Sequence, residues 1–369
     1  MNPKAGLDKK IIKCVVWDLD NTLWNGVLLE GDTVSLREGV LDVIAGLDER
    51  GILQSIASRN DYDLAMAKLK EFGIDEYFIC GQINWNSKAV SIRRISESIN
   101  IALDSVAFID DQPFEREEVS YTHAEVMCID AAHIDEVLDL PQMNPRFITD
   151  ESRQRRKMYL GDMVRRGAED TFPGTQTEFL ASLGMKLTIG PARNEDLQRA
   201  EELTIRTNQL NTTGYTYSYD ELCAFIESEN HELLVCELED KYGTYGKIGL
   251  ALTELKPEQH VLKLLLMSCR VMSRGIGTII INYIMSRAKS AGARLLAEYI
   301  ANERNRIMYV TLKFAGFREI KRNGEAVLLE SDLSRIQEFP AHVDVNILTG
   351  ASETGARNNA FHEQMDSIS

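Results

Sequence analysis

The feature that most constrains the fold is an alternation of short apolar segments with longer helical ones between residues 11 and 130. The apolar segments, rich in β-branched residues as strands are, are IIKCVVW (11–17), ILQSIAS (52–58), SVAFID (105–110) and AEVMCID (124–130). Helical stretches lie at 37–50, 61–73 and 89–99. Such alternation predicts βαβ units, and near-continuous apolar strands predict helices on both faces of the sheet. We therefore expect an α/β fold with a doubly wound parallel sheet.

The pattern changes after residue 140, where Pro141 and Pro145 interrupt the chain and a charged helical stretch follows at roughly 150–168. The later part predicts an α+β plan of strands and helices. Its expected elements are strand 185–190, helix 194–210, a hairpin of 231–240 with 246–255, strand 261–272 and a helix opened by SRGIG (273–277). The predicted organisation is an α/β domain at 1–140, a connector at 141–184, an α+β domain at 185–334 and a disordered tail at 335–369.

Composition excludes some classes of partner. The 369 residues carry a net charge of −16, which argues against nucleic acid and against an anionic membrane surface. The N-terminus has no apolar core of a signal peptide, and no window approaches 18 uncharged apolar residues. The six cysteines are scattered, without a zinc-type cluster. These observations predict a reduced, cytoplasmic protein.

Polar side chains that suit phosphoryl transfer follow the predicted strands, at the edge where open parallel sheets bind ligands. They are Asp18 and Asp20 after the first strand, Ser58 at the end of the second, Lys88 at the start of a helix, and Asp110 and Asp111 after the third strand. One carboxylate can form an aspartyl-phosphate, and a second can act as acid and base. Carboxylates also hold Mg²⁺, while a hydroxyl and an ammonium can hold phosphoryl oxygens. Each feature alone is common at strand ends and helix caps, but their combination in this order favours a catalytic site.

These segments also resemble a known superfamily. DLDNT (18–22), Ser58, Lys88 and Asp110-Asp111 are similar, in order, to the four motifs of the haloacid dehalogenase (HAD) superfamily of phosphatases. The resemblance implies that Asp18 is the nucleophile and that Asp20 is the acid/base. It further implies Mg²⁺ as cofactor, held by Asp18, the backbone carbonyl of Asp20 and Asp110, with Asp111 in support.

The spacing after Asp20 predicts how open this site is. About thirty residues separate Asp20 from the second strand, and a helix takes most of them. No separate cap domain fits there. We therefore expect an open rim, which another part of the protein must cover to exclude water.

A second candidate site surrounds Cys269, which precedes the glycine-bearing loop SRGIG. The backbone N–H groups of a helix N-terminus bind phosphates well, so Arg274, Gly275 and Gly277 are candidates for a pantetheine-phosphate site. With NERNRIMYVTLKFAGF (302–317), the loop resembles the acyl-CoA-binding motif of Gcn5-related N-acetyltransferases (GNAT), except at Met272, where Gln or Arg is usual. A buried strand cysteine is the alternative interpretation of Cys269.

A wider resemblance links both halves. RTNQLNTTG (206–214), DKYGTYGKIGLAL (240–252), LLMSCRVMSRGIG (265–277), WDLDNTLWNGVL, NWNSK and IDDQPFERE are similar to the FkbH-like family, in which a HAD domain precedes a GNAT-like domain. The resemblance implies a bifunctional glyceryl transferase/phosphatase of polyketide or related secondary metabolism. It would take a three-carbon acyl unit from 1,3-bisphosphoglycerate, remove phosphate and pass glyceryl to the phosphopantetheine thiol of an acyl carrier protein.

That scheme gives roles to residues of the second half. Cys269 would hold the acyl group as a thioester, and the SRGIG loop would hold the pantetheine arm. Asn208, Gln209 and Asn211 would bond substrate hydroxyls, although such a cluster is as often a helix C-cap and turn. RQRRK (153–157) or Arg165-Arg166 would supply a basic face for the carrier.

Two alternatives of different classes stay open. One is a small-molecule phosphatase fused to an ordinary N-acyltransferase, with Cys269 inert. The other is a binding or regulatory protein with a vestigial phosphatase site, which the complete set of motif residues disfavours.

Overall fold

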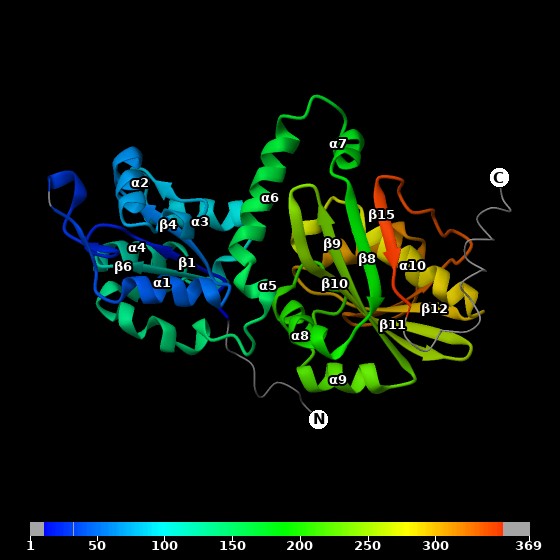
Figure 1. Ribbon diagram of the computed structural model, residues 1–369. Coiled ribbons are helices and arrows are strands. Elements are labelled where there is room, and N and C mark those ends of the chain that lie inside the picture. The colour runs from blue at the N-terminus through cyan, green and yellow to red at the C-terminus, as the bar shows by residue number, and fades with distance from the viewer. Residues whose placement is uncertain (1–10, 32, 350–369) are drawn as a thin grey trace. The chain divides into compact units, whose positions relative to one another are not determined.

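The computed structural model describes residues 11–31 and 33–349. Its contacts divide the chain into two compact units, Met1–Met163 and Val164–Ser369. Figure 1 shows a parallel sheet between helices in the first unit and a larger mixed sheet in the second. Each unit is described by itself.

The first unit contains a five-stranded parallel sheet with the order β5-β4-β1-β6-β7. The strands are β1 (Cys14–Trp17), β4 (Leu53–Ser58), β5 (Gln82–Ile83), β6 (Val106–Asp110) and β7 (Met127–Asp130). A short hairpin of β2 (Trp24–Asn25) and β3 (Ser35–Leu36) follows β1. The chain leaves β1 toward β4 and later returns on its other side through β6. The sheet therefore has its topological switch point between β1 and β6, where ligands of such sheets bind.

Helices cover both faces of this sheet (Figure 1). They are α1 (Val40–Glu49), α2 (Tyr62–Glu71), α3 (Lys88–Ile99) and α4 (Pro113–Thr122), with 3-10 helices η1 (Leu28–Glu30), η2 (Asp75–Tyr77), η3 (Leu103–Ser105), η4 (Ala131–Asp139) and η5 (Pro141–Met143). Successive residues of β1 serve opposite faces, as strand geometry requires. Val15 and Trp17 pack in the core with α1 and α2, whereas Cys14 and Val16 pack in the core with α3 and α4.

The predicted strands and helices of this region are present, and the elements that were missed include β5 and α4. Strand β5 has only two residues, too few for a periodic signal. Helix α4 buries only Glu115 and Val119, so its sequence has little of the apolar stripe that indicates a helix.

The second unit contains an eight-stranded mixed sheet with the order β13-β14-β12-β11-β10-β9-β8-β15. The strands are β8 (Met185–Pro191), β9 (His231–Asp240), β10 (Gly243–Lys256), β11 (Gln259–Met267), β12 (Arg294–Ile300), β13 (Phe317–Asn323), β14 (Ala326–Ser331) and β15 (Val343–Ile347). The helices are α7 (Gln176–Ser182), η6 (Asn194–Asp196), α8 (Leu197–Arg206), α9 (Tyr219–Glu227), η7 (Cys269–Val271), α10 (Ile276–Ser290) and α11 (Arg306–Phe314). Helices α8 and α9 pack in one core cluster, and α7, α10 and α11 in another.

The expected helix over 194–210 ends earlier, at Arg206, because the following residues join the sheet. Strands β11 and β12 pair only as far as Leu262 and Ala297. Beyond that point Thr212 bridges the gap: its N–H donates to Leu265 O at 3.0 Å, and its carbonyl accepts from Ile300 N at 3.0 Å. The segment around Thr212 thus occupies the edge that β11 would otherwise leave unpaired.

The charged connector forms α5 (Asp150–Arg153) and α6 (Arg155–Asp170). Its arginines serve intramolecular contacts. Arg155 donates to Gly51 O at 3.0 Å, and Arg156 donates to Asp48 Oδ1 at 2.9 Å. These two guanidinium groups attach the helix to the first unit, so they do not form the exposed docking face expected from the sequence.

Part of the expected disordered tail differs from the structure. Residues 343–347 form β15, the edge strand of the sheet, which pairs in parallel with β8 and buries Val343. Alternating apolar and polar residues in VDVNI suit an edge strand with one buried face. Residues 350–369 lie outside the described residues. Among the helices of the described chain, none is long and apolar enough to cross a membrane.

A buried ion pair stabilises the second unit and gives a testable contrast. Arg165 of α6 binds Asp240 through two hydrogen bonds of 2.8 and 2.9 Å, with both side chains almost fully buried. We expect Arg165→Ala to destabilise this unit by about 3–5 kcal/mol in urea unfolding, because it leaves a buried carboxylate without its partner.

The neighbouring pair Lys186–Glu239 provides the control. Its side chains are 62% and 56% exposed. Lys186→Ala should therefore lower the free energy of unfolding by less than about 1 kcal/mol. An equal loss of unfolding free energy in Arg165→Ala and Lys186→Ala would contradict the contrast between a buried and an exposed ion pair.

Candidate active site

The candidate site lies at the switch point of the first sheet. Asp18 directly follows β1, and its N–H donates to Ile109 O of the adjacent β6 at 2.9 Å. Asp110 ends β6 and Asp111 follows it. The pairing of β1 with β6 therefore brings together carboxylates that are about ninety residues apart in the sequence.

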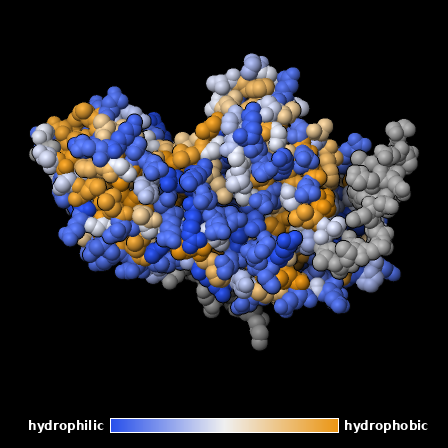
Figure 2. Space-filling view, in the orientation of Figure 1, coloured by the Kyte–Doolittle hydropathy of each residue, from blue (hydrophilic) through white to orange (hydrophobic). Residues whose placement is uncertain are grey.

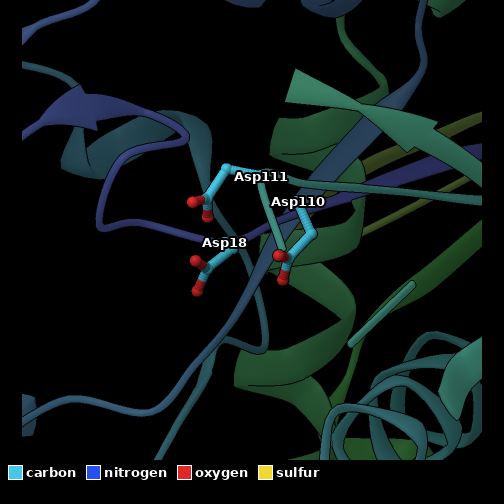
Figure 3. Close-up of side chains that lie close together, drawn as sticks. All are labelled: Asp18, Asp110 and Asp111. Carbon is cyan, nitrogen blue, oxygen red and sulfur yellow. The ribbon is translucent and has the colours of Figure 1, made fainter. Parts of the chain in front are cut away.

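Three carboxylates face a common space (Figure 3). Asp18, Asp110 and Asp111 each place one oxygen within 4.8 Å of the others. Asp18 and Asp110 are buried, whereas Asp111 is half-buried. Thr22 fixes Asp111, because the Thr22 hydroxyl donates to Asp111 Oδ1 at 3.3 Å and accepts from the Asp111 N–H at 3.0 Å.

The ammonium of Lys88 balances part of this negative charge. Lys88 begins α3, is 2% exposed, and forms an ion pair with Asp18 Oδ1. Its Nζ also lies 3.2 Å from Asp110 Oδ2 and 3.0 Å from Glu115 Oε2, and it donates to Ala57 O at 2.9 Å. One ammonium thus contacts three carboxylates.

This arrangement shifts the pKa values of the group. Burial raises the pKa of Asp18, and the ion pair with Lys88 opposes that rise. Burial, opposed by Lys88 and assisted by the charge of Asp18, raises the pKa of Asp110 to about 7. Burial alone would lower the pKa of Lys88, but Asp18, Asp110 and Glu115 together raise it. The carboxylates are therefore under-neutralised by protein cations.

The carboxylate cluster fits a divalent cation. Asp110 Oδ2 is buried and has the ion pair with Lys88 but no hydrogen bond, and the neighbouring oxygens are hard ligands of the kind that Mg²⁺ binds. The predicted ligands Asp18, Asp110 and Asp111 lie together. The carboxylate of Asp20 is not in this cluster.

Asp20 is instead held by three donors. Its Oδ1 accepts from Trp24 Nε1 at 2.8 Å and from Leu28 N at 3.1 Å, and its Oδ2 accepts from Asn60 Nδ2 at 3.0 Å. Asn60 and Trp24 are fully buried, so they fix the carboxylate in one orientation. This placement, separate from the metal cluster, suits the acid/base role that the sequence predicts.

Ser58 and an unpredicted residue, Glu115, complete the site. Ser58 ends β4 and hydrogen-bonds Asp18. Glu115 is buried on α4 and binds Lys88 on one side and Arg59 Nη1 on the other, at 3.0 Å each. The sequence analysis missed Glu115, Asn60 and Thr22, although all three lie in the quoted motifs or beside Ser58. The sequence feature that could have identified these three residues is their position close to the strand ends.

In the second unit, Cys269 lies in η7, just after β11, rather than in a strand. It is half-buried, and its Sγ lies 3.7 Å from Gln209 Oε1. The structure therefore brings together two predicted site residues that are 60 positions apart. The adjacent Arg270 donates to Tyr245 O at 2.6 Å, which directs its guanidinium to the backbone of β10.

The other predicted residues of this region have different surroundings. Asn208 is exposed. Asn211 is buried, and its Oδ1 accepts from Thr213 N at 3.0 Å and Gly214 N at 2.8 Å, so its amide serves the turn that the sequence also allowed.

The glycine-bearing loop turns tightly into α10. Gly275 is the N-cap with φ 77°, a left-handed conformation. A Cβ on Gly277 would lie 2.9 Å from Met267 Cε, the flexible end of a side chain of β11, which would have to shift. The predicted ligand Arg274 is buried, with Nη1 3.0 Å from Glu169 Oε2.

Residues 23–120 match the model of the haloacid dehalogenase-like hydrolase family. No curated protein matches the chain. Among solved structures, the N-terminal part of BF1531 from Bacteroides fragilis, described as containing a phosphatase domain complexed with Mg, is 29% identical. That match covers 37% of this chain and 40% of the other, less than half of that relative, with a TM-score of 0.31.

Two N-acetyltransferases are also similar. The ribosomal-protein-S18-alanine N-acetyltransferase of Escherichia coli is 15% identical over 42% of this chain and 97% of its own, with a TM-score of 0.33. The PaiA N-acetyltransferase of Thermoplasma acidophilum, in complex with coenzyme A, is 15% identical over 39% and 98%, with a TM-score of 0.32. The predicted α/β class is confirmed: a parallel sheet, in a region that matches the haloacid dehalogenase-like hydrolase model, is followed by a unit with a mixed sheet and helices.

The charge imbalance predicts that Mg²⁺ stabilises the first unit. A ligand that binds only the folded state, at about 100 times its dissociation constant, raises the free energy of unfolding by about 2.7 kcal/mol. We expect a rise in Tm of roughly 5–10 °C, measured by calorimetry with NaCl at matched ionic strength as control. Asp110→Asn should lose this rise. An equal rise in that variant would contradict the assigned ligand set.

The contacts of Asp20 predict a leaving-group effect. In Asn60→Ala the Asp20 carboxylate loses one donor, so if Asp20 is the acid/base as the sequence predicts, kcat should fall about 10-fold for an alkyl phosphate such as glycerol phosphate. The loss should be smaller for p-nitrophenyl phosphate, whose leaving group needs no proton.

Asn86→Ala is the matched control for this effect. The contacts of Asn86 with Arg59 and Asn84 use its backbone atoms, which the substitution keeps. An equal loss of activity on both esters in Asn60→Ala would argue against a role through Asp20.

Proposed function

We propose that this protein is a bifunctional enzyme with a Mg²⁺-dependent aspartyl phosphatase centre in the first unit and a thioester-forming acyltransferase centre in the second. The observation that carries the proposal is the Asp18–Lys88–Asp110 cluster at the switch point of the first sheet. The region around it matches the hydrolase family model. A structural ion pair would not need three carboxylates around one ammonium.

In the first phosphatase step, a carboxylate oxygen of Asp18 attacks the phosphorus of the substrate ester. The P–O bond to the leaving group breaks, and Asp20 gives its proton to the departing oxygen. Lys88 and Ser58 stabilise the charge on the transferred phosphoryl oxygens. Bound Mg²⁺, held by Asp18, Asp110 and Asp111, would supply further neutralisation of that charge.

In the second step, water hydrolyses the phosphoryl group on Asp18. Asp20 now accepts the proton of the attacking water, and phosphate leaves with the Asp18 carboxylate restored. Trp24 Nε1 and Asn60 Nδ2 hold Asp20 in one orientation through both steps. Asp20 therefore alternates between acid and base, returning to its starting state after each turnover.

For the acyl step, the thiolate of Cys269 attacks the carbonyl carbon of an acyl phosphate, and phosphate leaves. The acyl group then passes from Cys269 to a second thiol, an exchange of one thioester for another that needs positioning rather than driving force. Gln209 is the polar side chain placed against the thiol. Its amide is suited to bond the acyl carbonyl or a substrate hydroxyl.

The proposal also names an acyl donor and an acyl acceptor. We propose 1,3-bisphosphoglycerate as donor and the phosphopantetheine thiol of an acyl carrier protein as acceptor, which places the enzyme in polyketide or related secondary metabolism. The support is the resemblance of RTNQLNTTG, NWNSK and LLMSCRVMSRGIG to the FkbH-like family. The donor carries an acyl phosphate for Cys269 and a phosphate ester for Asp18, one group for each centre.

The main alternative is a phosphatase fused to an ordinary N-acyltransferase with an inert Cys269. The polar Gln209 Oε1 lies 3.7 Å from Cys269 Sγ, a placement that favours acyl chemistry on this thiol. The two hypotheses differ in whether the Cys269 thiol is required for acyl transfer.

Intact-mass spectrometry of a carrier incubated with 1,3-bisphosphoglycerate tests the proposal. The wild-type protein should add glyceryl to the carrier. Cys269→Ala should abolish the adduct and keep hydrolysis of p-nitrophenyl phosphate. Asp18→Asn should abolish hydrolysis and leave an adduct heavier by one phosphoryl group.

Cys223→Ala is the control, because Cys223 is another half-buried cysteine of the second unit. It should retain both activities. Full acylation of the carrier by Cys269→Ala would refute the thioester step, while hydrolysis retained in Asp18→Asn would refute the phosphatase assignment.

A further inference from the structure

Arg59 is a cation beside the phosphatase site to which the proposed mechanism gives no role. It follows Ser58, the last residue of β4. Its guanidinium turns toward α4, where Nη1 lies 3.0 Å from Glu115 Oε1 and Nη2 lies 3.7 Å from Glu118 Oε2. The Arg59 side chain is 39% exposed, whereas that of Glu115 is 6% exposed. The ion pair therefore links a half-exposed cation beside Ser58 to a buried carboxylate.

Burial separates this ion pair from the ordinary ion pairs of a protein surface. Hydrophilic side chains cover much of the face shown in Figure 2, and exposed ion pairs among such side chains contribute little to stability. The Glu115 carboxylate has less water to screen it, so its charge acts more strongly on the charges around it. One of these is the Lys88 ammonium, whose Nζ lies 3.0 Å from Glu115 Oε2.

Lys88 has more acceptors around it than it has N–H groups, because an ammonium offers three. The oxygens around its Nζ are Asp18 Oδ1, Ala57 O at 2.9 Å, Asp110 Oδ2 at 3.2 Å and Glu115 Oε2 at 3.0 Å. Of these, Asp110 Oδ2 is buried and has no hydrogen bond within the described residues. Glu115 therefore competes with Asp18 and Asp110 for the ammonium.

Arg59 reduces this competition. It contacts Oε1 of Glu115, whereas Lys88 contacts Oε2, so two cations share one carboxylate. With Arg59 in place, the charge of Glu115 is balanced without a full claim on Lys88, and the ammonium remains available to Asp18 and to phosphoryl oxygens. Without Arg59, Glu115 would draw on Lys88 alone and would add an uncompensated negative charge close to a dianionic phosphate ester.

We propose that Arg59 is a positioning residue of the phosphatase centre: it neutralises Glu115 and thereby keeps the Lys88 ammonium on the nucleophile and the transferred phosphoryl group. This inference rests on the proposed phosphatase step and adds a residue that does not touch the reacting atoms. Lys88 acts on phosphoryl oxygens rather than on the leaving group. The effect of Arg59 should therefore be the same for esters with good and with poor leaving groups.

A double-mutant cycle between Arg59 and Glu115 tests this role. The full-length protein is assayed at saturating Mg²⁺ with p-nitrophenyl phosphate and with glycerol phosphate. Arg59→Gln should lower kcat/KM about 10-fold on both esters, because less of the Lys88 charge acts on the phosphoryl group. In a Glu115→Gln background the same substitution should lower kcat/KM by less than about 2-fold, since no carboxylate is then left to compete.

Two further variants and a stability measurement separate this charge effect from a change of fold. Arg59→Lys keeps the positive charge, and one nitrogen suffices for the 3.0 Å contact with Glu115, so kcat/KM should stay within about 3-fold of wild type. Lys70→Gln removes an exposed cation from the last turn of α2 and should leave kcat/KM unchanged. Calorimetry should give each variant a Tm above the assay temperature.

The outcomes distinguish the possible roles of Arg59. Wild-type activity in Arg59→Gln would overturn the inference. A loss that persists in the Glu115→Gln background would show that Arg59 acts directly on the substrate, and a loss that Arg59→Lys does not restore, with a lower Tm, would leave it a structural role only; either result rejects the positioning role. A wild-type protein without Mg²⁺-dependent hydrolysis of either ester would overturn the proposed phosphatase function and this inference with it.

Discussion

The contact of the Lys88 ammonium with three buried carboxylates is the interaction on which the first unit depends. Lys88 binds Asp18, Asp110 and Glu115 at the ends of separate elements. It therefore joins β1, β6 and α4 through one charge. Arg59 also pairs with Glu115, but within the described residues Asp18 and Asp110 share Lys88 as their ion-pair partner, so this pair of carboxylates is under-neutralised. Stability and the capacity to bind a cation thus come from a single arrangement.

The site uses separate protein groups for separate tasks. In the proposed mechanism Lys88 and a cation held by the Asp18–Asp110–Asp111 cluster would balance negative phosphoryl charge, whereas Trp24 and Asn60 hold Asp20 apart from that cluster. Because Asp20 is bonded to its own donors, its orientation does not depend on the metal ligands. A phosphatase needs this separation, since the acid/base must exchange protons while the nucleophile stays ionised.

In the second unit, the pairing of the strands places the Cys269 thiol beside a polar side chain. Strand β11 leaves β12 after Leu262, and Thr212 fills the gap. The residues before Thr212 are thereby held against the end of β11, which brings Gln209 to Cys269. The buried pair Arg165–Asp240 holds α6 against the β9–β10 hairpin. The backbone of that hairpin in turn receives Arg270, the neighbour of Cys269.

The sequence by itself determined the parallel sheet and the carboxylates at its strand ends, because apolar runs that end in Asp18 and Asp110 indicate both the strand and the candidate site locally. It also determined the candidate thiol. Only the tertiary structure decided the roles of Glu115, Asn60 and Thr212, and the strand at 343–347. These residues act through partners distant in sequence, and their local patterns were those of ordinary helix, turn and tail. The same reason turned Arg155 and Arg156 from an expected docking face into internal contacts, since a charge has no fixed role until its neighbours are placed.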